Sequence, residues 1–217
     1  MSNVHFANEI EASGLNPLYI HLYRDGRDVA LSFKNAIVGE KHIYFLAKQW
    51  KEEQDKSTAL LAELGAERGI AISYEQLLKD EVGVLNSICK FLGVAYNPKV
   101  LTFYNSEESN LTAESGRMWK NLSKPIMHDN TKKYKRGLSE KEILIFESVA
   151  GDTLERLGYT LDSPSHSHLR FTQEEVEKFE AENTEMKKEV MNTAVLDDII
   201  RRQPRQQHLR EIMFRNV

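Results

Sequence analysis

The chain has 217 residues, which is room for one domain of ordinary size or for one domain with an appendage. Charged residues make up 29% and the net charge is −4, so we expect no nucleic-acid partner and no membrane partner. The lone Cys89 excludes an internal disulfide framework, no apolar run could span a bilayer, and the opening "MSNVHFANEIEASG" lacks the pattern of a signal peptide. A cytoplasmic location is therefore expected.

The first predicted unit is a strand followed by a helix. The short apolar run "LYIHLY" predicts a buried strand over residues 18–23, and a helix is predicted from about Arg27. The apolar face of that helix is expected to consist of Val29, Phe33, Ala36 and Ile37. The charged loop "RDGRD" lies between the strand and the helix, so it is either an ordinary solvated turn or a site that binds an anion.

A second unit of the same kind follows. A long helix is predicted from Ile43 to Leu64, and "GIAISY" predicts a strand over residues 69–74. After Asp80, "VLNSICKFLG" predicts an amphipathic helix that stops at Gly93. Two successive strand–helix units indicate a parallel sheet with helices packed on it.

The remainder is less regular. Residues 97–137 are polar with weak periodicity, which is typical of a long functional or mobile region. A capping box at Ser139 and Glu142 then begins a helix that ends at Gly158.

The C-terminal part is expected to be an appendage. "DSPSHSH" indicates a linker over residues 162–170, and a capping box at Thr172 and Glu175 begins a highly charged helix. Its apolar seam is too short for a coiled coil, so we interpret it as a stripe that docks onto the domain. The seam consists of Val176, Phe179, Asn183, Met186 and Val190. Pro204 is expected to break this helix before a basic tail.

The charged loop has the chemistry of an anion site. Backbone N–H groups at a helix start and the helix dipole favour a negative ligand, and Arg24 at the strand end can clamp a phosphate through two parallel hydrogen bonds. Gly26 permits a tight turn, and the hydroxyl of Ser32 can donate to the same phosphate. The alternative is that Arg24 pairs with Asp25 or Asp28 on the surface and that Ser32 has no role.

Three segments also carry a resemblance to a known family. "YIHLYRDGRDVALSF" resembles the 3′-phosphate-binding segment of the PAPS-dependent sulfotransferases. "ISYEQLLKDEVGVLNSICKFLGV" is similar to the later strand, Tyr-Glu pair and helix of that family, and "LSEKEI…LERLGY" is similar to its last helix. The resemblance covers residues 1 to about 161, in the family's order and with similar intervening lengths.

The resemblance implies an α/β fold with a partial P-loop-like parallel sheet flanked by helices, to which the charged C-terminal helix is appended. It implies transfer of a sulfuryl group from 3′-phosphoadenosine 5′-phosphosulfate (PAPS) to a hydroxyl or amine of a small-molecule or carbohydrate acceptor, without a metal. Arg24 and Ser32 map onto the pair that holds the 3′-phosphate, and Tyr74 maps onto the tyrosine that contacts the adenine. A packing aromatic at a strand end is the alternative for Tyr74.

The sequence also departs from the family pattern. No stretch resembles its Gly/Ser/Thr-rich phosphosulfate loop, so the chain is expected to begin partway through the domain. No catalytic base is assigned, and His5 is interpreted as a capping or surface residue. "KRG" aligns with the segment before the last helix rather than with the family's basic clamp. The lysines of that region are interpreted as a solvated basic loop, with phosphate contact as the alternative: Lys132, Lys133 and Lys135.

Two hypotheses from different classes follow. The first is a sulfotransferase whose domain spans residues 1–161, joined by the 162–170 linker to a charged helical tail over residues 171–217. The second is a non-catalytic module that keeps half of the nucleotide site and associates with itself through the tail helix or an exposed sheet edge. A nucleoside-triphosphatase or kinase is excluded, because the sequence has no "GxxxxGK[ST]" motif.

Overall fold

The computed structural model describes residues 3–116, 118–163 and 169–194. The chain divides into two compact units, one formed by residues 1–96 and 128–187 and the other by residues 97–127 and 188–217. The second unit contains η2 (Pro98–Asn105), α6 (Glu107–Glu114) and η3 (Lys120–Ser123). The predicted break at Pro204 and the basic tail lie outside the described residues, and the predicted domain boundaries near 161 and 171 stay predictions.

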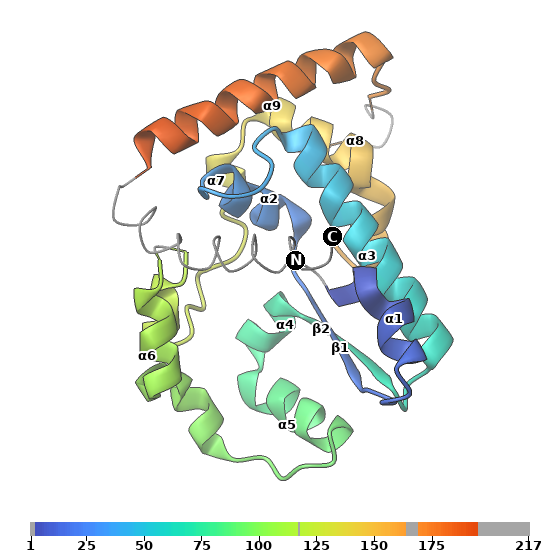
Figure 1. Cartoon of the computed structure of the whole chain (residues 1–217), viewed down its shortest axis with the longest axis vertical. Helices are drawn as coiled ribbons and strands as arrows, with labels where there is room; N and C mark the ends of the chain where they lie inside the picture. The colour runs from blue at the N-terminus through green and yellow to red at the C-terminus, as the bar shows by residue number, and fades with distance from the viewer. Residues whose placement is uncertain (1–2, 117, 164–168, 195–217) are drawn as a thin grey trace, which may run out of the picture. The chain divides into compact units, whose positions relative to one another are not determined.

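The sheet of the first unit has two parallel strands, β1 (Tyr19–Tyr23) and β2 (Gly69–Ser73) (Figure 1). They pair in register from Tyr19 opposite Gly69 to Tyr23 opposite Ser73. Both strands lie within one residue of the predicted ranges at each end. The predicted α/β class with a partial parallel sheet is therefore confirmed.

Helices make up most of the first unit. They are η1 (Asn3–Phe6), α1 (Ala7–Ala12), α2 (Gly26–Lys34), α3 (Ile43–Leu64), α4 (Tyr74–Lys79), α5 (Glu81–Phe91), α7 (Tyr134–Gly137), α8 (Glu140–Arg156) and α9 (Gln173–Thr193, whose last residues belong to the second unit). Among the described residues, no helix is long and apolar enough to cross a bilayer.

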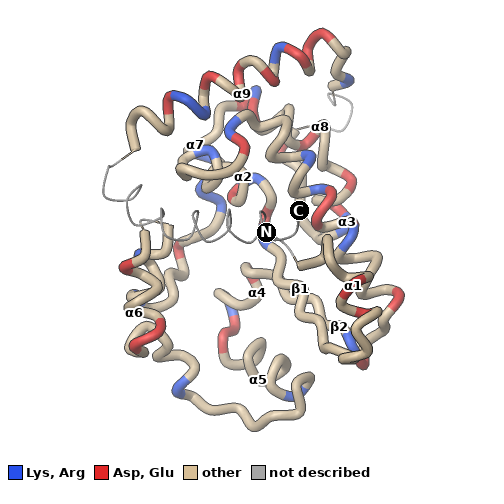
Figure 2. Tube along the Cα trace, in the orientation of Figure 1, with Lys and Arg blue, Asp and Glu red and all other residues tan. Residues whose placement is uncertain are grey.

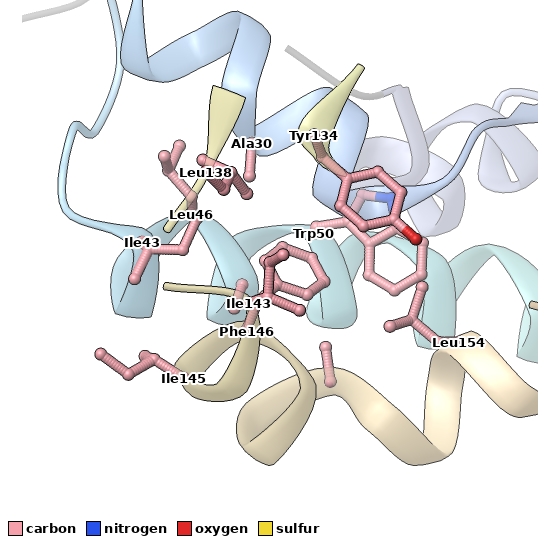
Figure 3. Close-up of a cluster of buried hydrophobic side chains, with 12 residues drawn as sticks. Ala30, Ile43, Leu46, Trp50, Tyr134, Leu138, Ile143, Ile145, Phe146 and Leu154 are labelled. Carbon is pink, nitrogen blue, oxygen red and sulfur yellow. The ribbon is translucent and has the colours of Figure 1, made fainter. Parts of the chain in front are cut away.

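The hydrophobic core lies where α3 and α8 pack together beside the start of α2 (Figure 3). Trp50 and Phe146 are almost fully buried, and their rings lie 5.8 Å apart. The same apolar periodicity that predicted α3 and α8 places these side chains on facing stripes. This core fixes the position of the β1–α2 loop above it.

Two helix boundaries differ from the predictions. The helix after β1 ends at Lys34, so Ala36 and Ile37 lie beyond it and the predicted apolar face was wrong there. The ammonium group of the buried Lys41 donates to the carbonyls of Phe33 and Val38 and thereby satisfies acceptors at this helix end.

The second difference is at Tyr74, which was predicted to end a strand and instead begins α4. The capping box of Ser73 and Gln76 begins this helix, because the Ser73 hydroxyl accepts from the Gln76 N–H and the Gln76 side chain accepts from the Ser73 N–H.

The helix α9 docks onto the first unit through part of its predicted stripe. Phe179 and Asn183 are buried, and the Phe179 ring stacks on His42 at 4.4 Å. The side-chain oxygen of Asn183 accepts from the backbone N–H groups of Lys41 and His42, at 2.8 and 2.9 Å. The predicted docking by one stripe is confirmed for these two positions.

Gly26 provides a test of the core. A Cβ at this position would lie 2.5 Å from a ring carbon of Trp50 and 2.6 Å from one of Phe146, so the close packing of two rings, rather than a tight turn, requires glycine here. We predict that Gly26→Ala lowers the free energy of unfolding by ~1–3 kcal/mol, the usual effect of overpacking a core. Urea denaturation measures this, and an unchanged midpoint would show that the rings can move aside.

Candidate functional site

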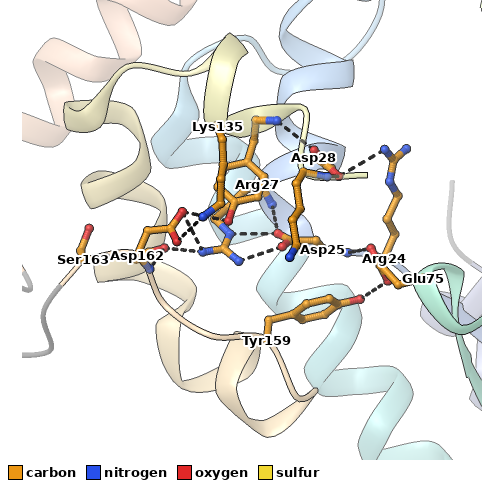
Figure 4. A network of polar contacts seen from close by, with 12 residues as sticks. Arg24, Asp25, Arg27, Asp28, Glu75, Lys135, Tyr159, Asp162 and Ser163 are labelled. Carbon is orange, nitrogen blue, oxygen red and sulfur yellow. Dashed lines mark hydrogen bonds and ion pairs between the residues drawn. The ribbon is translucent and has the colours of Figure 1, made fainter. Parts of the chain in front are cut away.

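The segment from Arg24 to Asp28, where β1 passes into α2, is not an ordinary solvated turn, because three of its four charged side chains are buried. Asp25, Arg27 and Asp28 are only 6%, 2% and 1% exposed. Asp25 is the N-cap of α2, and its side chain accepts from the Arg27 N–H at 3.0 Å. Figure 4 shows the network of polar contacts around these residues.

Arg27 is at the centre of this network. Its guanidinium binds both oxygens of Asp25, at 2.7 and 3.0 Å, and the Glu147 carboxylate of α8 at 2.5 Å. Burial lowers the pKa of Arg27, but Asp25 and Glu147 outweigh that effect, and the pKa is raised. Arg27 thus joins the start of α2 to α8 through buried ion pairs.

Glu147 connects Arg27 to the segment that follows α8. Its carboxylate also accepts from the backbone N–H groups of Asp162 and Ser163, at 2.9 and 2.7 Å. The Asp162 side chain in turn accepts from the Tyr134 hydroxyl and from Lys135. Burial, together with the hydrogen bond to Asp162, raises the pKa of Tyr134, although the Arg27 charge opposes this.

Asp28 binds the backbone at the start of α7 and thereby links it to the start of α2. Its carboxylate accepts from the backbone N–H groups of Lys132 and Tyr134, at 2.8 and 2.9 Å. Lys132 has a φ of 52°, which is uncommon for a residue with a side chain. The buried Asp28 charge thus holds this segment near the strand ends.

Arg24 is the more open of the two arginines in the loop. Its side chain is 20% exposed, and its guanidinium lies 4.7 Å from the centre of the Tyr74 ring. One terminal nitrogen donates to the Asn130 carbonyl at 2.6 Å and lies 3.4 Å from Asp28. The Nε–H group is buried without an acceptor. Arg24 therefore has an unused donor.

Arg24 and Tyr74, two of the three predicted binding residues, are brought together by the structure. The Asn130 side-chain amide donates to the Tyr74 hydroxyl at 2.9 Å, so Asn130 contacts both residues. Tyr74 is consequently not a packing aromatic alone, because its hydroxyl has a polar partner.

Ser32, the third predicted binding residue, is exposed on α2, where its hydroxyl donates to the Asp28 carbonyl at 3.0 Å. In the described part of the chain, no hydrogen bond joins Ser32 to Arg24 or Tyr74. Asp28 and Ser32 lie one turn apart on α2, and Arg24, which precedes the N-cap Asp25, reaches the side chain of Asp28 at 3.4 Å.

Glu75, in the first turn of α4, binds the same segment. Its carboxylate accepts from the Asp25 backbone N–H at 3.1 Å and from the Tyr159 hydroxyl at 2.8 Å. Burial and the Glu75 charge raise the pKa of Tyr159. Tyr159 is therefore a neutral hydrogen-bond donor that positions Glu75.

The remaining candidates lie at the edge of this arrangement or away from it. Lys135 pairs with Asp162 at 2.8 Å, whereas Lys132 and Lys133 are exposed. His5 contacts Lys56 and Glu53 of α3 and is not part of the network. No group of three or more metal-ligating side chains occurs among the residues that the structure describes.

The sequence missed several residues that build the site. Glu147 stands on the apolar stripe of α8, three residues before Ala150, and an acidic residue in that position was an available signal. Glu75 belongs to the Tyr-Glu pair of the second resembling segment. Asn130 had no signal beyond its place in a polar, irregular region.

Comparison with known proteins identifies a family for the N-terminal part of the chain. Residues 3–98 match a family model that is described as the Sulfotransferase family. This segment contains β1, α2, β2 and Tyr74, which are the elements that carry the Arg24 site. No curated protein matches the chain.

The buried ion pair gives a second prediction. We expect Glu147→Gln to lower the free energy of unfolding by about 3 kcal/mol, because the buried Arg27 charge loses one of its two close carboxylate partners and keeps only Asp25 and the more distant Asp162, at 3.9 Å. Urea denaturation measures the loss. Glu52→Gln is the matched control, since Glu52 pairs with Lys56 on the surface and its substitution should leave the midpoint unchanged. Equal effects of the two substitutions would contradict a special role of Glu147.

Proposed function

We propose that the segment of residues 3–98, which matches a model of the Sulfotransferase family, binds the 3′-phosphoadenosine part of PAPS at Arg24, Ser32 and Tyr74. The proposed reaction transfers the sulfuryl group of PAPS to a hydroxyl or amine of a small-molecule or carbohydrate acceptor. The family match supports transferase chemistry in general, and the donor and the acceptor are parts of the proposal.

The single observation that carries the proposal is the state of Arg24. It lies where β1 passes into α2, it contacts Tyr74, and its Nε–H is buried without an acceptor. A buried donor without a partner is energetically costly, and a phosphate oxygen would satisfy it. The dipole of α2, which is nine residues long, adds positive potential at the same end.

The charges around Arg24 permit an anion to compete for it. Asp28 is the carboxylate nearest to Arg24, but two backbone N–H groups already stabilise its charge. Arg27 is neutralised by Asp25 and Glu147. If Arg24 exchanges its long contact with Asp28 for a phosphate, the Asp28 carboxylate still keeps the hydrogen bonds from the Lys132 and Tyr134 backbone N–H groups.

The chemical role of these residues would be to position the donor. Sulfuryl transfer depends mainly on holding donor and acceptor in line and on stabilising charge. Tight binding of the 3′-phosphate would contribute by restricting the orientation of the donor. The exposed Ser32 hydroxyl would rotate away from the Asp28 carbonyl to donate to that phosphate. We assign no catalytic base among the described residues.

A nucleotide-binding module without transfer activity is the second candidate. It would use the Arg24 and Tyr74 contacts to bind the nucleotide without transferring its sulfuryl group. Both candidates use the same 3′-phosphate contacts, and they differ in whether sulfuryl transfer from PAPS accompanies binding.

Calorimetric titration with adenosine 3′,5′-bisphosphate tests the proposal. We expect weak binding, with a dissociation constant above about 1 μM. Arg24→Ala should weaken the binding free energy by ~1.5–3 kcal/mol, the contribution of a charged hydrogen bond. Arg170→Ala removes an equal charge at an exposed position outside the site and should have little effect.

Adenosine 5′-phosphate, which lacks the 3′-phosphate, provides the decisive control. It should bind the wild-type chain and Arg24→Ala with equal affinity, because the group that Arg24 contacts is missing. If Arg24→Ala weakened the binding of both nucleotides equally, or of neither, Arg24 would not recognise the 3′-phosphate.

A further inference from the structure

The side chains of Asn130 and Tyr74 present one hydrogen-bond acceptor and one donor side by side. The Asn130 amide nitrogen donates to the Tyr74 hydroxyl at 2.9 Å. Because an amide nitrogen can only donate, the hydroxyl accepts in this bond and keeps its own proton for another acceptor. Among the residues that the structure describes, neither this proton nor the amide oxygen of Asn130 has a hydrogen-bond partner. Both residues are partly exposed.

Two further contacts fix this pair beside Arg24. The Asn130 carbonyl accepts from the Arg24 guanidinium at 2.6 Å, and the guanidinium lies 4.7 Å from the centre of the Tyr74 ring. Two residues further along the chain, the Lys132 N–H donates to the buried Asp28 carboxylate at 2.8 Å, which restricts the backbone that carries Asn130. The pair therefore lies next to the group that we propose binds the 3′-phosphate.

A neutral donor and acceptor suit a nucleobase better than they suit a phosphate. The two strands that lead to the site carry no charged residue (Figure 2), and Arg24, directly after β1, supplies a positive charge for the phosphate. Asn130 and Tyr74 add only uncharged groups, which match an uncharged base. One ribose joins the base to the 3′-phosphate in adenosine 3′,5′-bisphosphate, so the groups that bind them have to be neighbours, as Arg24 and Tyr74 are.

Adenine has the complementary pattern of hydrogen-bonding groups. Its amino group is a donor and a neighbouring ring nitrogen is an acceptor, the arrangement that asparagine reads in DNA. The amide oxygen of Asn130 would accept from the amino group, and the Tyr74 hydroxyl would donate to the ring nitrogen. Hypoxanthine and guanine carry a carbonyl oxygen in place of the amino group, so the amide oxygen would face a second acceptor. Such loss of a partner lets a binding site reject a close analogue.

We propose that Asn130 determines the base specificity of this site and selects adenine over hypoxanthine and guanine. This rests on the proposed nucleotide binding and adds to it the residue that distinguishes the bases. The Tyr74 ring alone cannot distinguish them, because every base offers a face on which an aromatic ring can stack. If Asn130 only held Tyr74 in place, its loss would weaken the binding of all purine nucleotides equally.

Calorimetric titration with adenosine 3′,5′-bisphosphate and inosine 3′,5′-bisphosphate tests the selection, because both compounds carry the same phosphates and ribose. The wild-type chain should bind the adenosine compound tighter by about tenfold or more. Asn130→Ala keeps the backbone carbonyl that Arg24 contacts and removes the amide, so it should reduce the ratio of the two affinities to about twofold or less. Asn130→Leu, which keeps the side-chain volume, should do the same if the alanine variant does not fold. Asn86→Ala, at an exposed position of α5, should keep the wild-type ratio.

Arg24→Ala separates this proposal from the proposed nucleotide binding. It should weaken the binding of both compounds by the same factor and leave their ratio unchanged, since both carry the 3′-phosphate. Equal binding of the two compounds to the wild type would overturn the base selection alone, and so would an Asn130→Ala variant that keeps the wild-type ratio. Binding of neither compound up to about 1 mM would overturn the nucleotide site together with the base selection.

Discussion

The buried ion pair of Arg27 with Asp25 and Glu147 is the constraint on which the rest of the site depends. A guanidinium that is 2% exposed requires carboxylate partners with good geometry, and these partners come from the start of α2 and from the middle of α8. Because Glu147 also holds the backbone of Asp162 and Ser163, one charge cluster joins three distant parts of the sequence. The position of Arg24 at the end of β1 follows from this arrangement.

Local patterns were sufficient to predict the elements. Alternating and helical periodicities identified β1, β2, α3 and α8, and the capping boxes at Ser139 and Thr172 located the starts of α8 and α9. The end of α2 was not predicted. The carbonyls at this helix end are bound by the ammonium group of Lys41, which lies seven residues beyond Lys34 in the sequence. Such a contact depends on the path of the loop between them, which a periodicity cannot encode.

The candidate site was predictable only in part, for a related reason. The charged loop suggested an anion site or a solvated turn, and neither interpretation anticipated that Arg27 and Asp28 would be buried. Their partners Glu147 and Tyr134 lie more than 100 residues away. A sequence pattern can propose which charges gather locally, but tertiary packing decides which of them is neutralised. That distinction separates Arg27, which is paired with Asp25 and Glu147, from Arg24, which keeps an unused donor.

The strand β1 presents the proposed nucleotide site at its carboxyl end. Arg24 follows directly on its last residue. A two-stranded sheet is marginal on its own and relies here on packing against α3 and on the ties that Asp28 and Glu75 make beyond the strand ends.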